Sequence, residues 1–418
     1  MKRRSCGHTD KGTVREDNQD SLYVDEEMGL YIVCDGMGGY AAGEVASQTA
    51  VEVISEHIKQ YKKNIPRTDD FDQLHIALAT LLQDAVSTAC QKILKLVEEN
   101  QNYAGMGTTM TLLLIHGNKG VMGHVGDSKL YLYRRNRFHQ LNRDHTLANR
   151  LLSEGVISPD ELATSPVAHV LTRAIGRQES VSVDTLIFDL VPGDCCLLCS
   201  DGFSNAFDNT KEFADLLPVG KFEETNDPDF KVLAEALVDT AVARDGSDNT
   251  TAILVSFEEG EGAEDEKERS EDVYLKIDTL KKVYLFEDLS LQEILTVMEN
   301  VKVLDCKAGS LVVKEGHAGD SMFVILAGGF DVTRASQKLA ELGPGMHFGE
   351  IALISQEVRT ANVVASVDSR LLVMEREGFE KLLRAKKDIG ISLLRKLAEE
   401  LSVRLARTNE KLQQQGES

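Results

Sequence analysis

Two short, largely apolar runs in this sequence each lead into an aspartate that a glycine follows. Leu30–Cys34 precedes Asp35, and Cys195–Ser200 precedes Asp201. Runs of this length without polar alternation are typical of strands that are covered on both faces. Because a carboxylate at the end of a buried strand is held at the rim of its sheet, the runs predict a layered fold with acidic groups at a sheet edge.

Two further acidic signatures lie near the two ends of the same region. They are Arg15–Asp20, which reads REDNQD, and the pair Asp248-Asn249. Each signature alone has an ordinary explanation, since an aspartate next to a glycine is most often part of a turn. Together they predict that several distant carboxylates meet at one metal site. Hard oxygen ligands select Mg²⁺ or Mn²⁺, whereas zinc would recruit histidine and cysteine.

The acidic residues suggest separate roles at a site with two cations. Asp35 is the candidate to bridge both ions, and the glycines after it leave the Gly36 carbonyl free as a second ligand. Asp201 and Asp248 would complete the ligands of the first ion, and Asp20 would orient bound waters. A water shared by two cations is a strong nucleophile at neutral pH, which suits in-line attack on a phosphate ester.

A phosphate dianion also needs a positive partner in such a site. Arg15 lies close to Asp20 in the sequence, and its planar guanidinium has the geometry to hold two phosphate oxygens. The alternative is that Arg15 is an ordinary surface residue, and the arginine alone would not decide between the two.

Composition narrows the classes of protein to which the chain can belong. Its 418 residues favour two domains, and no stretch approaches the roughly 18 apolar residues of a membrane span. The basic start Met1–Ser5 runs directly into polar residues, so we expect no secretory signal and a cytoplasmic location. The net charge of −22 argues against binding to nucleic acid. We therefore expect a soluble protein with neither a membrane nor a nucleic-acid partner.

The seven cysteines show no framework spacing and lie mostly in apolar segments. We therefore expect reduced thiols. Cys196 and Cys199 form a CxxC, but on a strand their side chains point to opposite faces, so core packing is favoured over zinc or redox chemistry.

The acidic segment 258–272 (EEGEGAEDEKERSED) divides the chain. It lacks bulky apolar residues, and we predict an extended linker between domains at 1–257 and 273–418, with a regulatory helix as the alternative. The first domain alternates short strands with amphipathic segments at Gly43–Lys63 and Asp72–Asn100, which predicts an α+β fold of antiparallel sheets flanked by helices. In the second domain, a helix at Ser290–Glu299 precedes short strands with glycine turns, and helices follow from residue 376.

Residues 7–257 resemble the metal-dependent PPM (type 2C) family of serine/threonine phosphatases in its bacterial form. The matching segments are Gly12–Ser21, Val33–Glu44, Met106–Met110, His124–Arg134, Arg143–Leu147, His169–Gly176, Cys199–Phe203 and Asp245–Leu254. The resemblance implies a four-layer α-β-β-α sandwich of two antiparallel sheets around a bimetal site. It also implies that Asp35, Gly36, Asp201 and Asp248 bind metal and that Arg15 contacts the substrate phosphate. Asp127 matches the position that binds a third metal in bacterial members.

One position departs from the animal members of that family. They carry a histidine two residues after the bridging aspartate, where it can act as a general acid, and this chain has Met37 there, as bacterial relatives do. A methionine cannot carry the proton, so another group or an ordered water would protonate the leaving alkoxide.

The second domain contains the segment GMHFGEIALISQEVRTANVV, between Gly345 and Val364. A glycine before a helix start presents free N–H groups to an anion, and an arginine nine residues after Glu350 could neutralise a phosphate. Residues 279–380 resemble a cyclic nucleotide-binding domain, a small β-roll with flanking helices. The resemblance implies a set of residues that hold the ribose and the cyclic phosphate: Gly349, Glu350, Ala352, Arg359 and Thr360. Thr360 gives a weak preference for cyclic GMP over cyclic AMP.

These observations favour a Mg²⁺- or Mn²⁺-dependent phosphatase that acts on phosphoserine and phosphothreonine proteins and responds to a cyclic nucleotide. The rival is a cyclic-nucleotide sensor whose phosphatase-like half is an inactive scaffold. A transcription factor is set aside, because no DNA-reading element follows Glu375. The leucine stripe of the last helices, which includes Leu382, Leu393, Leu397 and Leu405, favours a packing face and leaves a homodimer open.

Overall fold

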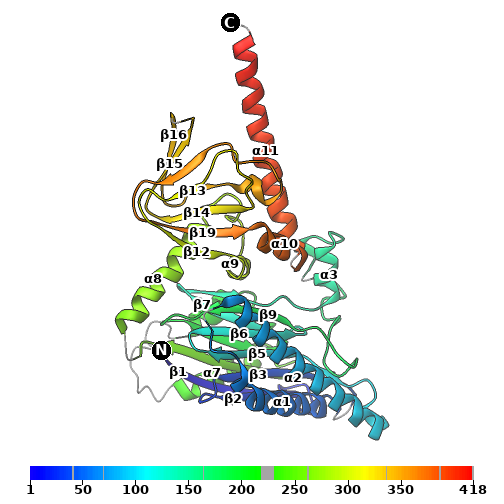
Figure 1. Cartoon of the computed structure of the whole chain (residues 1–418). Helices are drawn as coiled ribbons and strands as arrows, with labels where there is room; N and C mark the ends of the chain where they lie inside the picture. The colour runs from blue at the N-terminus through cyan, green and yellow to red at the C-terminus, as the bar shows by residue number, and fades with distance from the viewer. Residues whose placement is uncertain are drawn as a thin grey trace. The chain divides into compact units, whose positions relative to one another are not determined.

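The computed structural model divides into two compact units, Met1–Ser270 and Glu271–Ser418 (Figure 1). The boundary falls inside the segment 258–272 that was predicted as a linker. Within the described part of the chain, no helix is long and apolar enough to cross a membrane. The structure describes residues 1–39, 42–68, 70–162, 164–217, 230–260, 263–335, 337–385 and 387–416.

The first unit contains two antiparallel sheets. In order across the first sheet, the strands are β1 (Lys2–Asp10), β11 (Thr250–Glu258), β10 (Cys195–Cys199), β7 (Lys129–Arg134) and β8 (Arg137–Gln140). The second sheet has the order β2 (Asp20–Asp25), β3 (Leu30–Met37), β5 (Met110–His116), β6 (Lys119–Val125) and β9 (Asp184–Asp189), and β4 (Gly107–Thr108) pairs with the end of β3. The sheets pack on each other where β10 meets β3 and β5.

Helices cover the outer face of each sheet. The helices α1 (Ala42–Tyr61) and α2 (Phe71–Glu99) share a core with the β3 sheet, and α7 (Phe230–Arg244) shares one with the β10 sheet. The shorter helices are α3 (Leu147–Ser153), α4 (Pro159–Leu162), α5 (Asp201–Ser204) and α6 (Thr210–Leu216), with 3₁₀ turns η1 (Lys62–Asn64) and η2 (Gln101–Tyr103).

Strand β3 explains why the layers number four. Leu30, Ile32 and Cys34 belong to the core shared with α1 and α2, while the alternate residues Tyr31 and Val33 are equally inaccessible on the opposite face. A strand buried on both faces needs a helix layer on one side and a second sheet on the other. The predicted α-β-β-α sandwich is therefore confirmed.

The prediction of an extended linker at 258–272 is wrong for most of that segment. Helix α8 runs from Ala263 to Leu280, while positions 261 and 262 lie outside the described residues. Three acidic residues in its first turn suit the positive end of the helix dipole. Asp272 pairs with Lys276 one turn later at 2.6 Å. Alternation of charge sign along the segment thus supports a helix where net charge alone suggested repulsion.

The second unit is a β-roll of two four-stranded sheets, as predicted. One has the order β12 (Lys302–Cys306), β19 (Ser369–Glu375), β14 (Ser321–Ala327) and β17 (His347–Phe348). The other has the order β13 (Leu311–Val313), β18 (Asn362–Ala365), β15 (Phe330–Arg334) and β16 (Gln337–Leu342). Residues from both sheets, including Ile325 and Phe330, form one core.

Helices precede and follow this roll. Helix α9 (Leu291–Met298) begins at the predicted cap, where the Ser290 hydroxyl accepts from the Glu293 N–H and the Glu293 carboxylate accepts from the Ser290 N–H. The short 3₁₀ turn η3 spans Glu350–Leu353, and α10 (Arg376–Ala385) and α11 (Lys387–Gly416) end the unit. Leu393 and Leu397 of the predicted stripe are buried, so a packing face is present on α11.

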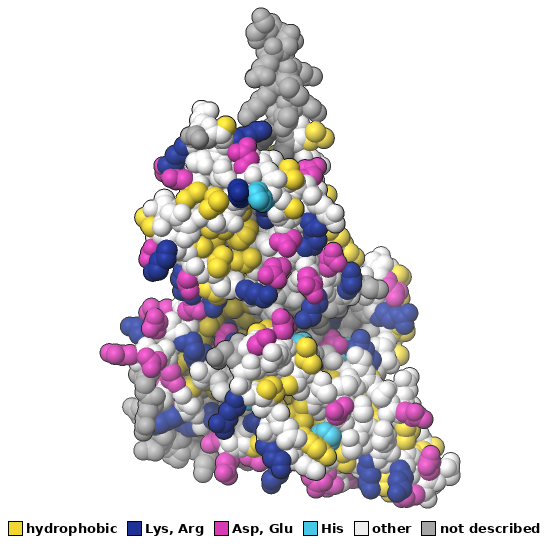
Figure 2. Space-filling view, viewed as in Figure 1, with side chains coloured by type: hydrophobic (Ala, Val, Ile, Leu, Met, Phe, Trp, Pro, Cys, Tyr) yellow, Lys and Arg dark blue, Asp and Glu magenta, His cyan; other side chains and the backbone are white. Residues whose placement is uncertain are grey.

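Acidic and basic side chains are interspersed over the face of the molecule in Figure 2. Among the described residues, the excess of acidic side chains therefore forms no continuous acidic surface on that face.

Candidate functional site

Strand pairing brings the predicted carboxylates together. Asp20 opens β2 and lies directly opposite Asp35 in the β2–β3 register. Asp201 follows β10 in the facing sheet, and burial together with the charge of Asp201 raises the pKa of Asp35. Asp248 lies two residues before the start of β11 and borders the same cleft. Two sheets thus contribute acidic groups to one rim, as the apolar runs predicted.

Arg15 joins this group through Asp248. Its Nη2 lies 2.7 Å from Asp248 Oδ2, and the arginine side chain is 52% exposed. Arg15 therefore stands at the mouth of the site with part of its guanidinium accessible. A phosphate entering the cleft would meet donors that are already oriented by a carboxylate.

Asn249 has a structural role that the sequence reasoning missed. Its Oδ1 accepts from the Gln19 N–H at 2.8 Å, and its Nδ2 donates to the carbonyl oxygens of Lys11 and Asp17 at 3.0 and 2.9 Å. The amide thereby ties the loop before β2 to the start of β11. In the sequence, the indication of this role was the position of Asn249 next to Asp248.

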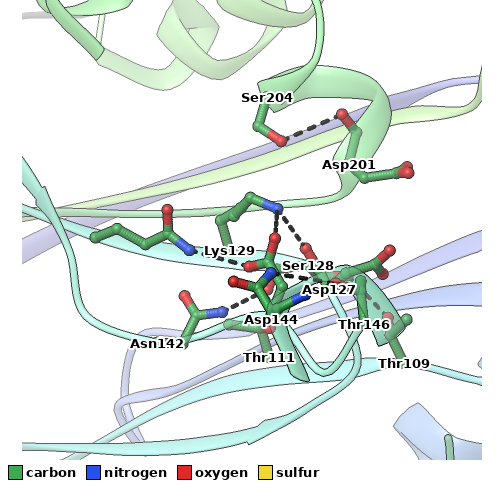
Figure 3. A network of polar contacts seen from close by, with 12 residues as sticks. Thr109, Thr111, Asp127, Ser128, Lys129, Asn142, Asp144, Thr146, Asp201 and Ser204 are labelled. Atoms are coloured by element: carbon green, nitrogen blue, oxygen red, sulfur yellow. Dashed lines mark hydrogen bonds and ion pairs between the residues drawn. The ribbon is translucent and has the colours of Figure 1, made fainter. Parts of the chain in front are cut away.

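Asp127 lies in the turn between β6 and β7, after Gly126 with a φ of +111°. Lys129 supports this turn: its Nζ donates to the Asp127 carbonyl at 2.8 Å and to Asp144 Oδ2 at 2.7 Å (Figure 3). The pair Lys129–Asp144 is largely buried. A buried cation is thus fixed behind the turn that carries Asp127.

A pair of buried hydroxyls links the Asp127 turn to Asp35. The Thr109 hydroxyl accepts from the Asp35 N–H at 2.9 Å and lies 2.8 Å from the Ser128 hydroxyl. The Thr109 N–H in turn donates to the Asp35 carbonyl at 2.9 Å. Neither hydroxyl was predicted as part of the site, although polar residues at the start of an apolar strand were a visible signal.

Crowding of carboxylates perturbs their titration. Burial raises the pKa of Asp35 well above its usual range, and the charges of Asp20, Asp201, Asp127 and Asp248 raise it further. Burial likewise raises the pKa of Asp20 to about 7 and that of Asp127 to about 7. Without a bound cation, these three carboxyl groups therefore hold a proton at higher pH than an ordinary aspartate does.

The site fits hard cations that keep other oxygen ligands. In the described part of the chain, no group of three or more His, Cys, Asp or Glu side chains is arranged to hold an ion by itself. Mg²⁺ is typically bound through one or two carboxylates and retains waters. Asp20 Oδ1 is buried without a hydrogen-bond partner, so one carboxylate oxygen awaits a positive or donating group.

Glycine is required next to Asp35. A Cβ added to Gly36 would lie 2.1 Å from the Gly43 carbonyl oxygen, so no other residue fits between β3 and α1. Met37 follows, and its thioether has no proton to donate to a leaving group.

A cleft of about 1000 Å³ opens over these carboxylates. It is lined by residues of the loop before β2, the end of β3, the Asp127 turn and a segment without helix or strand that follows residue 168. The side chains used below are Arg15, Asp35, Asp127, Arg173, Arg177, Asp201 and Asp248. The site is therefore open to a side chain presented on a polypeptide.

The second unit gathers part of the predicted nucleotide site. Gly349 has a φ of +82° and leads into η3, where Glu350 and Ala352 are buried. The Arg359 guanidinium donates to the Ser321 carbonyl at 2.7 Å and to that of Gly349 at 3.4 Å. Three of the predicted residues thus lie together around one arginine.

Glycines make the space that Arg359 occupies. A Cβ on Gly319 would lie 1.9 Å from Arg359 Nε, and one on Gly349 would lie 2.5 Å from its Nη1. Burial lowers the pKa of Arg359, while Asp320 and Glu350 raise it. Thr360 is exposed, so its hydroxyl is accessible to a ligand.

The CxxC cysteines form no site. Cys196 and Cys199 are free and fully buried, and burial raises the pKa of each thiol. They pack as core residues, as predicted.

Two sequence families match the chain, each over a different part. Residues 6–239 match the family described as protein phosphatase 2C, and residues 303–386 match the cyclic nucleotide-binding domain family. The second match covers the strands around Arg359 together with α10.

Individual relatives resemble the first unit. The serine/threonine phosphatase stp of Listeria welshimeri is 32% identical over 250 residues, which are 59% of this chain and 93% of the relative. A crystal structure of the serine/threonine phosphatase PstP/Ppp of Mycobacterium tuberculosis is 31% identical, with a TM-score of 0.52 over 62% of this chain and 100% of that one. A structure of the PstP catalytic domain in complex with two manganese ions is 31% identical, with a TM-score of 0.50 over 62% of this chain and 99% of that one.

Proposed function

The chain is a protein serine/threonine phosphatase of the protein phosphatase 2C family, and on this premise we propose that its first unit hydrolyses phosphoserine and phosphothreonine esters with Mn²⁺ or Mg²⁺. The observation that carries the proposal is the gathering of Asp35, Asp127, Asp201 and Asp248 on the lining of one open cleft, where burial and the charges of the other three raise the pKa of Asp35. Like charges gathered in this way are stable at neutral pH only with a proton or a cation.

Asp35, the Gly36 carbonyl, Asp201 and Asp248 would hold two ions, and Asp127 would hold a third. Bound divalent cations supply charge neutralisation and a water of lowered pKa for attack on phosphorus. The chain's own residues place the groups: β2 sets Asp20 opposite Asp35, where its carboxylate would orient water.

Arg15 would bind the substrate phosphate. It lines the cleft, is half exposed, and is oriented by its hydrogen bond to Asp248. Its fixed guanidinium donors suit two phosphate oxygens. Because Met37 has no proton to give, the leaving alkoxide would be protonated by water rather than by that side chain.

Hydrolysis of a phosphothreonine peptide by the full chain tests this proposal. We expect activity that requires Mn²⁺ or Mg²⁺, disappears with EDTA, and falls at least a thousandfold in Asp35→Asn. Asp208→Asn, an exposed aspartate outside the cleft, is the matched control and should retain wild-type turnover. Full activity of Asp35→Asn would contradict the metal assignment.

We further propose that the second unit binds a cyclic nucleotide and regulates the phosphatase. Gly349, Glu350 and Ala352 would hold the ribose and phosphate with Arg359, and the exposed Thr360 hydroxyl favours cyclic GMP over cyclic AMP. Calorimetric titration of the full chain with each nucleotide, followed by activity at saturation, tests both statements. Unchanged kinetics with bound nucleotide would leave two tethered but independent modules.

The rival interpretation, a sensor with an inactive phosphatase-like scaffold, requires the loss of a site residue. Asp20, Asp35, Asp127, Asp201 and Asp248 are all present, and the first four of them influence one another's titration. We therefore favour the enzyme, which we place in the cytoplasm.

We also propose that α11 pairs with a second copy of the chain. Ile391, Leu394, Leu401 and Leu405 are exposed at heptad spacing, on a different side of the helix from the buried Leu393. Helix α11 extends well beyond the strands of its own unit (Figure 1). Light scattering should give a dimer, and Leu401→Glu with Leu405→Glu should give a monomer.

A further inference from the structure

The catalytic cleft contains an arginine, Arg177, that has no assigned role. Arg15 is paired with Asp248 at 2.7 Å, and Arg173 is paired with Asp184 at 2.7 Å. Arg177 is exposed and lines the same cleft. No hydrogen bond or ion pair to another described residue engages it. A cation without a partner inside a cleft is available to an anion that enters with the substrate.

Short strand pairing fixes the backbone beside Arg177. Ile175 and Thr108 exchange hydrogen bonds of 2.8 and 3.0 Å across an isolated bridge. Thr108 pairs in turn with Gly36 at the end of β3. Two backbone pairings therefore connect Gly36, which follows the proposed bridging carboxylate, to Ile175, which lies two positions before Arg177.

A tight turn between Ile175 and Arg177 sets the direction of the chain. Gly176 has a φ of +86°, and a Cβ there would lie 2.4 Å from Ile93 Cγ2 of α2. Only glycine meets both requirements. The Arg177 guanidinium lies over β4, since a Cβ on Gly107 would be 3.2 Å from its Nε.

These steps give an order of magnitude for the reach of the arginine. Neighbouring strands lie about 4.8 Å apart, so Ile175 is roughly 10 Å from Gly36. An extended peptide rises about 3.3 Å per residue, so this span corresponds to about three residues of a bound substrate. The Arg177 guanidinium lies between Ile175 and Gly36, over β4, and is therefore placed to meet a side chain within about three residues of the phosphorylated one.

We propose that Arg177 forms an anion subsite that selects phosphoprotein substrates with an acidic residue within about three positions of the phosphoserine or phosphothreonine. The inference rests on the proposed phosphatase activity of the same cleft. The chain carries a net charge of −22, so an acidic substrate would be repelled in general, and a fixed cation at the cleft counters this locally. Arginine is suited to the task because its planar fork matches a carboxylate.

Specificity constants of the full chain with Mn²⁺ test the proposal. The substrates are phosphothreonine peptides identical except for Asp, Ala or Lys at a single position, placed up to about three residues before or after the phosphothreonine. We expect kcat/KM to favour the Asp peptide over the Lys peptide by about fivefold at low salt in at least one of these placements, as for a solvent-accessible ion pair. Since exposed charges are screened within about 10 Å at 0.1 M salt, the ratio should shrink as salt is added.

Charge reversal provides the decisive comparison. Arg177→Glu should invert the Asp-to-Lys ratio, and Arg177→Ala should bring it close to one. Arg67→Glu reverses an exposed arginine that does not line the cleft and should keep the wild-type ratio. A wild-type ratio near one, or an unchanged ratio in Arg177→Glu, would overturn the inference.

The two failures are distinguishable. If the wild type hydrolyses none of the peptides in the presence of Mn²⁺, the proposed function itself is wrong. If it hydrolyses all of them equally well, the phosphatase stands and Arg177 is only a surface charge.

Discussion

Asp35 is the residue at which the proposed function and stability conflict. It is partly buried among carboxylates, and folding raises its pKa. A raised pKa means that the folded, metal-free protein holds this proton more tightly than the unfolded chain does, so ionisation of Asp35 costs folding free energy. We predict that Asp35→Asn, which mimics the neutral acid, raises the melting temperature in EDTA by several degrees while it abolishes turnover. Circular dichroism measures the first effect, and Asp208→Asn should show neither.

The same linkage gives a pH window. Asp127 has a pKa of about 7 in the folded protein, against about 3.9 for a free aspartate. The stability of the folded protein therefore falls as pH rises from the unfolded-state pKa to the folded-state pKa, and it does not change further at higher pH. We predict that metal-free Asp127→Asn matches wild-type stability near pH 4 and exceeds it increasingly up to about pH 7. A constant difference over this range, measured by urea unfolding, would contradict the raised pKa.

The Thr109 hydroxyl is predicted to set the spacing of the two metal-binding loops. Thr109→Val keeps the side-chain shape but leaves the Asp35 N–H and the Ser128 hydroxyl without their partner, at a cost of about 1–3 kcal/mol. We expect the variant to need at least tenfold more Mn²⁺ for half-maximal activity, and Thr109→Ser to restore the wild-type requirement. A Mn²⁺ titration of activity checks this, and equal requirements in Val and Ser variants would contradict it.

At the scale of elements, a buried ion pair joins β7 to the turn before β10. Arg134 Nε and Nη2 lie 2.9 and 2.6 Å from the two oxygens of Asp194, and both side chains are almost inaccessible. Arg134→Met would leave Asp194 buried without this cation, and we predict a loss of about 3–5 kcal/mol. The double variant with Asp194→Leu should recover much of that loss. Urea unfolding measures both, and a single variant as stable as the wild type would contradict the prediction.

Elements that carry their own pattern could be predicted from the sequence. The runs at Leu30–Cys34 and Cys195–Ser200 became β3 and β10, since short uninterrupted apolar runs suit strands covered on both faces, and all their residues as far as Cys34 and Cys199 are buried. Strand β1 escaped prediction, since the residues Lys2–Asp10 are mostly polar and pair with β11 at the sheet edge. Helix α8 was mistaken for an extended linker, because its buried apolar residues Val273, Ile277 and Leu280 lie just beyond the acidic segment on which that prediction was based.

The candidate site divides in the same way. Carboxylates that follow apolar runs can be recognised in the sequence. Their convergence could be expected because the sheets that bury those strands bring the strand ends together. The partners of Thr109 and Asn249 and the position of Arg177 depend on register and on loops from distant parts of the chain. Local sequence carries no record of those pairings, so only the folded structure could supply them.

At the scale of the whole molecule, each unit has a core of its own, and we propose a separate ligand for each. A ligand that binds the folded state alone at a hundred times its dissociation constant adds about 2.7 kcal/mol to the stability of the unit that binds it. Independent units would therefore melt separately, with Mn²⁺ raising one transition and cyclic nucleotide the other.

Regulation requires that each ligand also changes the affinity for the other. Coupling free energies are reciprocal, so if cyclic nucleotide tightens Mn²⁺ binding by some factor, saturating Mn²⁺ must tighten nucleotide binding by the same factor. We predict at least a fivefold effect in both calorimetric titrations of the full chain, and its loss in Arg359→Glu, whose arginine lies against Ser321 and Gly349. Lys381→Glu, an exposed change on α10, should keep the coupling. Equal affinities with and without the second ligand would show that the chain consists of two tethered but independent modules. Equal coupling factors in both directions would show that both ligands shift one conformational equilibrium that the two units share.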